Sequence, residues 1–276
     1  MTDYRQWTTA ISIKATDYET LRRLKDCGVD GIELSVPCAE CDDIAWAELR
    51  KNADAASVEI LSYHLPFSQE VHIASPDEAH RTKMVAYLEG MIEKACAVGI
   101  RRFVIHPSTE PIADEERPAL MAASKKSLAE LAQFAAERGA VLCVEDLPRT
   151  CLGHTVDEML ELISADDRLM VCFDVNHLLT VYGSTHREFV EKLGSRIVTT
   201  HMSDYDFLDE KHFFPGYGMI DWKEVVELLE AADYSGPFLY EGGFGPSARA
   251  PEVPYGTYEM ARRRHLTIKE LRGKKA

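Results

Sequence analysis

The feature that most constrains the fold is an alternation, repeated eight times, of a short apolar run with a polar or amphipathic stretch. The runs are rich in β-branched residues, as the strands of a parallel sheet are when both faces are covered. Strands that alternate with helical stretches predict βαβ units. The expected strands occupy residues 7–15, 31–36, 58–66, 101–108, 140–148, 169–177, 197–204 and 237–243.

Four of the intervening stretches carry helix start and stop signals, at residues 17–28, 75–99, 114–139 and 221–236. A polar side chain at the start can cap the free backbone N–H groups of the first turn, and a glycine often ends the last turn. The N-cap candidates are Asp17, Ser75 and Asp221, and the glycine stops are Gly28, Gly99 and Gly139.

Eight βα units in 276 residues predict a single (β/α)8 TIM barrel in the α/β class, since that fold needs roughly 250 residues. A doubly wound open sheet is the alternative. It would place a glycine-rich phosphate loop after its first strand, and the sequence contains neither G-x-G-x-x-G nor G-x-x-x-x-G-K. No low-complexity linker interrupts the series, so we expect residues 1–276 to form one domain.

The composition of the chain argues against nucleic acid and membranes as binding partners. A formal net charge of −15 gives no general attraction to nucleic acid or to anionic membranes. No apolar run approaches the ~18 residues of a membrane span, and the first residues lack the pattern of a secretion signal. The seven cysteines are an odd number scattered through the expected elements, which suits a reducing compartment. We therefore expect a cytoplasmic protein with a small-molecule substrate, and a homo-oligomer stays open.

Seven of the eight runs end in Glu, Asp or His. In a TIM barrel these ends converge on one face, where the active site is assembled. So many buried ionisable groups need a neutralising partner, and a divalent cation supplies one. The residues are Glu33, His64, His106, Glu145, Asp174 with His177, His201 with Asp204, and Glu241.

Four of them come from the last four runs and can therefore surround one point. We predict that they hold one divalent ion, because carboxylates with imidazole suit Mn²⁺, Zn²⁺, Co²⁺ or Mg²⁺ better than a soft metal. The predicted ligands are Glu145, Asp174, His201 and Glu241.

The series VEDLP, FDVNH, HMSD, PGYGMIDW and YEGG resembles the xylose isomerase-like barrel superfamily. More narrowly, it resembles the sugar phosphate isomerase/epimerase family, with ketose 3-epimerases of the D-tagatose 3-epimerase type. The resemblance spans nearly the whole chain. It implies the same four metal ligands and a substrate contact for His177, three residues after Asp174.

The chemistry expected from residues and resemblance together is isomerisation or epimerisation of a sugar or sugar derivative. One of Glu145 and Glu241 would remove a proton beside a polarised carbonyl, a metal-bound enediolate would form, and the other would return the proton. Other side chains expected to face the substrate are His64, His106, His212 and Glu33. Five aromatic residues are candidates for core packing or for an apolar wall against a sugar ring: Trp7, Tyr63, Phe67, Phe214 and Tyr217.

One stretch departs from the 3-epimerases. They place an arginine shortly after the histidine that His201 matches, and residues 202–212 contain none, which implies a different orientation of the substrate. The isolated candidates for a phosphate clamp are Lys14 and Arg149. An unphosphorylated sugar, an inositol derivative and a sugar acid all stay open, as does an inosose dehydratase-like lyase that eliminates water at the same site.

A nuclease is the alternative from another class. Endonuclease IV shares the superfamily and binds three zinc ions, and the strand-end residues, together with Glu210 and His212, offer a candidate for nearly every ligand type. The acidic charge and the lack of basic and aromatic clusters in the loops argue against DNA binding. A non-catalytic sugar-binding barrel is a third alternative.

Overall fold

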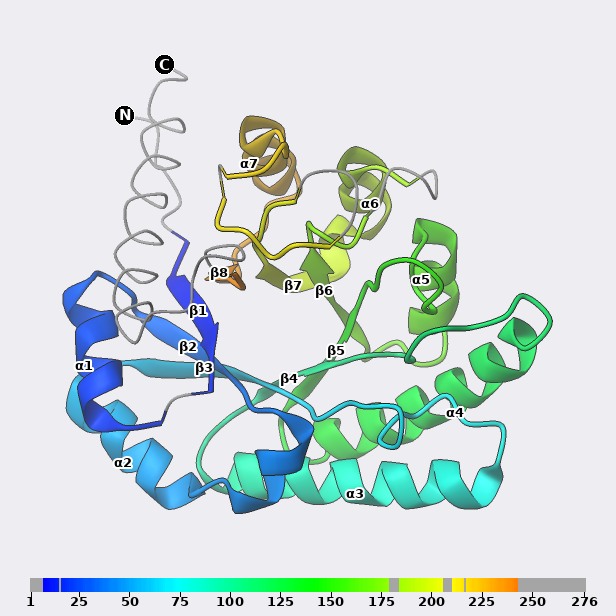
Figure 1. Cartoon of the computed structure of the whole chain (residues 1–276), viewed down its shortest axis with the longest axis horizontal. Coiled ribbons are helices and arrows are strands. Elements are labelled where there is room, and N and C mark those ends of the chain that lie inside the picture. Colours follow the sequence, from blue (N-terminus) through cyan, green and yellow to red (C-terminus); the bar gives the residue numbers. More distant parts are fainter. Residues whose placement is uncertain (1–6, 15, 179–183, 206–209, 216, 243–276) are drawn as a thin grey trace.

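A computed structural model describes residues 7–14, 16–178, 184–205, 210–215 and 217–242 (Figure 1). None of the helices in this part of the chain is long and apolar enough to cross a membrane. The strands are β1 (Thr9–Ile13), β2 (Gly31–Ser35), β3 (Glu59–His64), β4 (Arg102–Ile105), β5 (Val141–Glu145), β6 (Met170–Asp174), β7 (Ile197–His201) and β8 (Phe238–Tyr240). The α-helices are α1 (Tyr18–Asp26), α2 (Trp46–Ala56), α3 (Glu78–Ala97), α4 (Arg117–Ala136), α5 (Val156–Ile163), α6 (His186–Leu193) and α7 (Trp222–Ala231).

The strands form one parallel sheet in the order β7-β6-β5-β4-β3-β2-β1-β8. The two edge strands meet through a parallel bridge between Met202 and Tyr240, which nearly closes the barrel. The amide of Met202 donates to the carbonyl of Leu239 at 2.8 Å, and the amide of Glu241 donates to Met202 at 3.3 Å. The predicted TIM barrel is thereby confirmed, and one domain over residues 1–276 stays a prediction.

Each predicted strand contains the observed one, and the strands lie inside a layer of helices (Figure 1). A small apolar cluster of Val104, Cys143 and Cys172 is fully buried. These residues precede His106, Glu145 and Asp174 by two positions, so strand alternation places each pair on the same face of the sheet. The cluster therefore forms an apolar floor beneath the strand ends.

The helix signals were mostly confirmed. Asp17 caps α1 by accepting from Thr20 N at 2.9 Å, and Asp221 caps α7 by accepting from Lys223 N and Glu224 N at 3.1 Å each. Ser75 was wrong as a cap. Because α3 begins only at Glu78, the carboxylate of Asp77 reaches its first turn, accepting from Ala79 N at 3.0 Å.

Three helices were not singled out from the sequence: α2, α5 and α6. Two of these, α5 and α6, are only eight residues long, too short to show much periodicity. The N-cap of α5 is Thr155 and that of α6 is Thr185. Their hydroxyls accept hydrogen bonds from the backbone N–H groups of Glu158 and Glu188.

Candidate metal centre

Four carboxylate and imidazole groups meet at the centre of the barrel mouth. Glu145, Asp174 and His201 are the last residues of β5, β6 and β7, and Glu241 directly follows β8. One ligand atom from each lies within 4.8 Å of the others. The Nδ1 atom of His201 is 2.9 Å from Glu145 Oε1, 3.0 Å from Glu241 Oε2 and 3.9 Å from Asp174 Oδ2. We call these four residues the central cluster, and they are the four predicted metal ligands.

The environment of Asp174 fits a divalent cation. Its Oδ1 atom accepts from the amide of Asn176 at 2.7 Å, whereas no group in the described part of the chain hydrogen-bonds its buried Oδ2 atom. Burial raises the pKa of Asp174 to about 7, with Glu241 adding to the shift and His177 opposing it. A buried carboxylate oxygen that accepts no hydrogen bond is unfavourable unless a cation or a proton joins it. Three carboxylates and an imidazole are donors that suit Mn²⁺, Zn²⁺, Co²⁺ or Mg²⁺.

Glu33 supports the central cluster from below. Its Oε1 atom is 2.9 Å from Nε2 of His201, and its Oε2 atom accepts from the Ser62 hydroxyl at 2.8 Å. The side chain is fully buried and is not part of the cavity wall described below. A carboxylate behind a ligating histidine fixes the ring and raises its basicity. The geometry therefore favours a positioning role for Glu33 over the predicted substrate contact.

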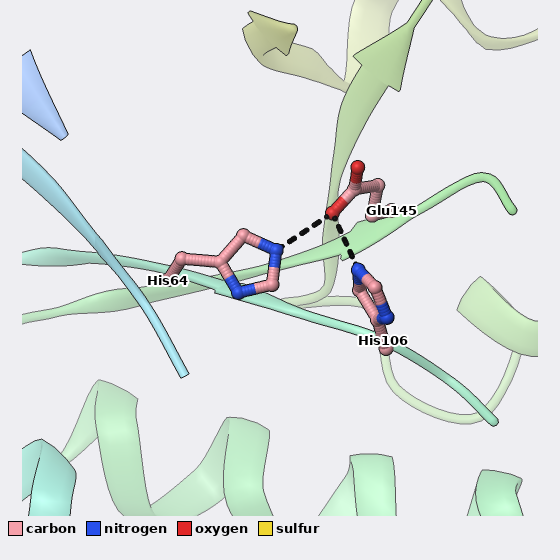
Figure 2. Close-up of side chains that lie close together, drawn as sticks. All are labelled: His64, His106 and Glu145. Atoms are coloured by element: carbon pink, nitrogen blue, oxygen red, sulfur yellow. Dashed lines mark hydrogen bonds and ion pairs between the residues drawn. The ribbon is translucent and has the colours of Figure 1, made fainter. Parts of the chain in front are cut away.

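A second group of possible ligands shares Glu145. The Nε2 atoms of His64 and His106 lie 3.1 Å and 3.3 Å from Glu145 Oε2, so both rings face the same carboxylate oxygen (Figure 2). His64 Nδ1 donates to the carbonyl of Leu65 at 3.0 Å, which leaves its Nε2 as the atom directed at Glu145. We call His64, His106 and Glu145 the His64 cluster.

A third group lies beside the central cluster and comprises His177, Glu210 and His212, the His177 cluster. Oε1 of Glu210 is 2.6 Å from His212 Nε2 and 3.5 Å from His177 Nε2. His177 Nδ1 donates to the carbonyl of Asp146 at 2.7 Å, and a side-chain oxygen of Asp146 accepts from the amide of Asp174 at 2.8 Å. Asp146 thus positions both His177 and the backbone of Asp174.

Cys172 also lies within ligand distance of Glu145 and His201. Burial raises the pKa of its thiol well above the usual value, so the thiol stays protonated near neutral pH. A protonated thiol is a poor ligand, and the place of Cys172 in the apolar floor is that of a packing residue.

Without an ion, histidines and carboxylates neutralise one another. Burial alone would raise the pKa of Glu145, but His201 and His106 hold it well below its usual value. Burial also opposes charge on His201 and His177, yet the acidic groups around them raise both pKa values well above the usual range. A divalent ion bound here would therefore have to displace protons from imidazolium groups, so its affinity would fall as the pH is lowered.

A cavity of about 320 Å³ opens over these clusters, within the size range of small-molecule sites. The predicted substrate-facing residues His64, His106, His177 and His212 line it. Phe67 stacks on the ring of His106 with centroids 3.7 Å apart and lines the same wall. Of the other aromatic candidates, Trp7, Tyr63 and Phe214 are buried in the core and Tyr217 is exposed.

Several residues of the cavity wall were not predicted from the sequence. Gln69 follows β3, and Thr109 and Glu110 follow β4. The available signal was their position, because loops after the strands of a barrel build its active face. Of the two phosphate-clamp candidates, Lys14 pairs with Glu40 at 3.4 Å outside this cavity, whereas Arg149 lines it.

The family of this chain follows from its similarity to known proteins. Residues 21–254 match the family described as the xylose isomerase-like TIM barrel. The chain belongs to this family. Among curated relatives, an uncharacterised protein of Methanocaldococcus jannaschii is 31% identical over 196 residues, which cover 68% of this chain and 66% of that protein.

Two more distant relatives carry names that describe an activity. An inosose dehydratase of Histophilus somni is 31% identical over 143 residues, covering 44% of this chain and 47% of that protein. An inosose isomerase of Halalkalibacterium halodurans is 28% identical over 178 residues, covering 60% and 61%. The chain thus aligns with less than two thirds of the length of each of these relatives.

Solved structures share the whole barrel. A D-psicose 3-epimerase has a TM-score of 0.79 at 18% identity, covering 95% of this chain and 98% of that one. A D-tagatose 3-epimerase-like protein has a TM-score of 0.78 at 23% identity, covering 98% and 100%. At these identities the likeness shows a common fold.

We predict that Glu33→Gln lowers the affinity for a divalent ion by about 10-fold or more, because a carboxylate hydrogen-bonded to a ligating histidine contributes that much. The measurement is competition with a chelating indicator, with circular dichroism to verify folding. Glu59→Gln, the same change at an exposed position of β3, is the matched control. Equal affinities for the two variants would contradict the positioning role.

We predict a pH effect on the metal-free protein that depends on His212. Burial opposes its charge, but the hydrogen bond to Glu210 outweighs burial and raises the pKa of His212 to about 9. A raised pKa stabilises the fold below the unfolded value of about 6.5, and this contribution is lost as the pH rises toward 9.

The measurement is the unfolding temperature of the chelator-treated protein between pH 6 and 10. The wild-type curve should fall more steeply between about pH 6.5 and 9 than the curve of His212→Gln. Parallel curves would show that His212 does not carry this charge.

Proposed function

We propose that the chain is a divalent-metal-dependent isomerase or epimerase that acts on a sugar or sugar derivative. The observation that carries the proposal is the central cluster, four ligand groups within 4.8 Å of one another at the base of a cavity of about 320 Å³. The family, its inosose-processing relatives and the sugar epimerases of the same fold support the reaction class.

The residues at the strand ends would have two roles in this reaction, metal binding and proton transfer. A divalent ion held by Glu145, Asp174, His201 and Glu241 would polarise the substrate carbonyl and lower the pKa of the neighbouring C–H. Glu145 and Glu241 are the carboxylates placed to remove a proton and to return it. General acid–base transfer of this kind contributes typically ~10²–10⁴-fold to the rate.

The histidines of the wall hold the substrate. His64 and His177 each donate through Nδ1 to a backbone carbonyl, which leaves their Nε2 atoms directed at the carboxylates of Glu145 and Glu210. Such rings can hydrogen-bond hydroxyl groups of a sugar or cyclitol. Phe67 offers an apolar surface beside them.

A dehydratase uses the same first step. Removal of a proton beside a carbonyl gives an enediolate, and departure of the adjacent hydroxyl group as water completes an elimination. The inosose dehydratase relative supports this variant. The products separate the two reactions, because elimination consumes the substrate without forming an isomer.

The second candidate is a three-metal hydrolase of the endonuclease IV type. The observation that favours it is that the His64 and His177 clusters, like the central cluster, each bring ligand atoms within 4.8 Å of one another. Against it stands the net charge of −15. In addition, Arg149 of the cavity wall is paired with Glu110 and Glu210, which limits its use for phosphate.

Metal content distinguishes the candidates. We expect about one divalent ion per chain after re-loading and dialysis, measured by elemental analysis. About three zinc ions per chain, together with cleavage of duplex DNA at an abasic site, would establish the nuclease instead. A protein that retains no metal would contradict both. The cytoplasmic location and a homo-oligomeric state stay predictions.

Solvent exchange tests the proton transfer directly. With a panel of D-psicose, D-tagatose, L-ribulose and inosose in D₂O, we expect the wild-type protein to incorporate deuterium next to the carbonyl of one of them. Glu241→Gln should slow this exchange about 100-fold or more, with metal content measured in parallel because Glu241 is also a predicted ligand. Exchange at the wild-type rate in Glu241→Gln would remove Glu241 from the proton transfer.

A further inference from the structure

Arg149 occupies an unusual position in the cavity wall. It lies in the segment after β5, and its backbone has a φ of 56°, in the left-handed region that non-glycine residues seldom adopt. Such backbone conformations persist where surrounding contacts hold them, and they are frequent at functional sites.

Two carboxylates hold the guanidinium. Nε of Arg149 donates to Glu110 Oε1 at 2.8 Å and to Oε2 at 3.0 Å, and Nη2 makes a further contact with Oε1. From the other side, Nη1 lies 2.9 Å from Glu210 Oε2. A forked arginine–carboxylate pair is strong and directional, and it uses the same donors that would bind a phosphate or carboxylate of a ligand.

The charged residues that line the cavity are mostly acidic. Among the described lining residues, Arg149 is the single lysine or arginine, and the same lining includes four carboxylates: Glu110, Glu145, Glu210 and Glu241. Glu145 and Glu241 belong to the central cluster and Glu210 to the His177 cluster. Glu110 belongs to none of the three ligand clusters found among the described residues, and its carboxylate pairs with Arg149.

We propose that Glu110 sets the charge selectivity of the cavity. By holding Arg149 in a forked pair, it keeps this arginine from binding an anionic group and so favours uncharged sugars or cyclitols over phosphate esters and sugar acids. The choice among sugars rests on the proposed function, whereas the effect on anion binding does not.

The first test uses inorganic phosphate with the metal-loaded full-length protein, and binding is measured by ³¹P NMR titration. Glu110→Gln should bind phosphate at least about 10-fold more tightly than the wild type, because the forked ion pair is lost and Nε and Nη2 of Arg149 become available to an anion. The matched control is Glu224→Gln. Glu224 forms an exposed ion pair with Arg187, with 2.7 Å between Nη2 and Oε1, and neither residue lines the cavity. This variant should bind phosphate like the wild type. In Glu110→Gln combined with Arg149→Met the gain should disappear.

The second test uses D-fructose and D-fructose 6-phosphate, followed by ligand-observed NMR. The wild type should favour the free sugar, and Glu110→Gln should shift the preference toward the phosphate ester by a similar factor. If neither the wild type nor a variant binds either sugar, the proposed function is contradicted for these ketohexoses. The phosphate titration still decides the role of Glu110.

Two results would overturn the inference. One is equal phosphate binding by the wild type and Glu110→Gln. The other is a loss of phosphate binding in the single variant Arg149→Met, since that would show that Arg149 already binds anions in the presence of Glu110. The single variant also serves if Glu110→Gln does not fold, because it leaves both carboxylates in place.

Discussion

The site depends on the buried carboxylate of Glu145. One of its oxygens contacts His201 and the other contacts His64 and His106, so a single side chain joins the central cluster to the His64 cluster. A carboxylate this deeply buried is tolerated only with several charged or hydrogen-bonding partners. The strand ends around it provide them, which explains why ionisable residues are concentrated at the mouth of the barrel.

The sequence predicted the fold and most of the centre for one physical reason. In a parallel barrel, the last residue of each strand reaches the same face whatever the loops do, so the position of Asp174 or His201 in its run is enough to place it. The same argument found the histidines that line the cavity.

The rest depends on contacts between distant segments. Glu33 lies within β2 rather than at its end, and only the three-dimensional structure reveals that it supports His201. The pairing of Arg149 with Glu110 joins the loops after β4 and β5, and no local pattern announces such a pair. For the same reason, Phe67 could not be separated by sequence from aromatic residues that are buried in the core.

Barrel closure has a consequence for how the protein holds together. β8 has only three residues, and the seam between β7 and β8 is formed by the bridge at Met202 and Tyr240. His201 and Glu241 are the neighbours of these two residues and stand on opposite sides of the seam. The binding free energy of an ion bound by both residues would therefore also oppose separation of β7 from β8. The group proposed to activate the substrate would then also fasten the barrel where backbone pairing is shortest.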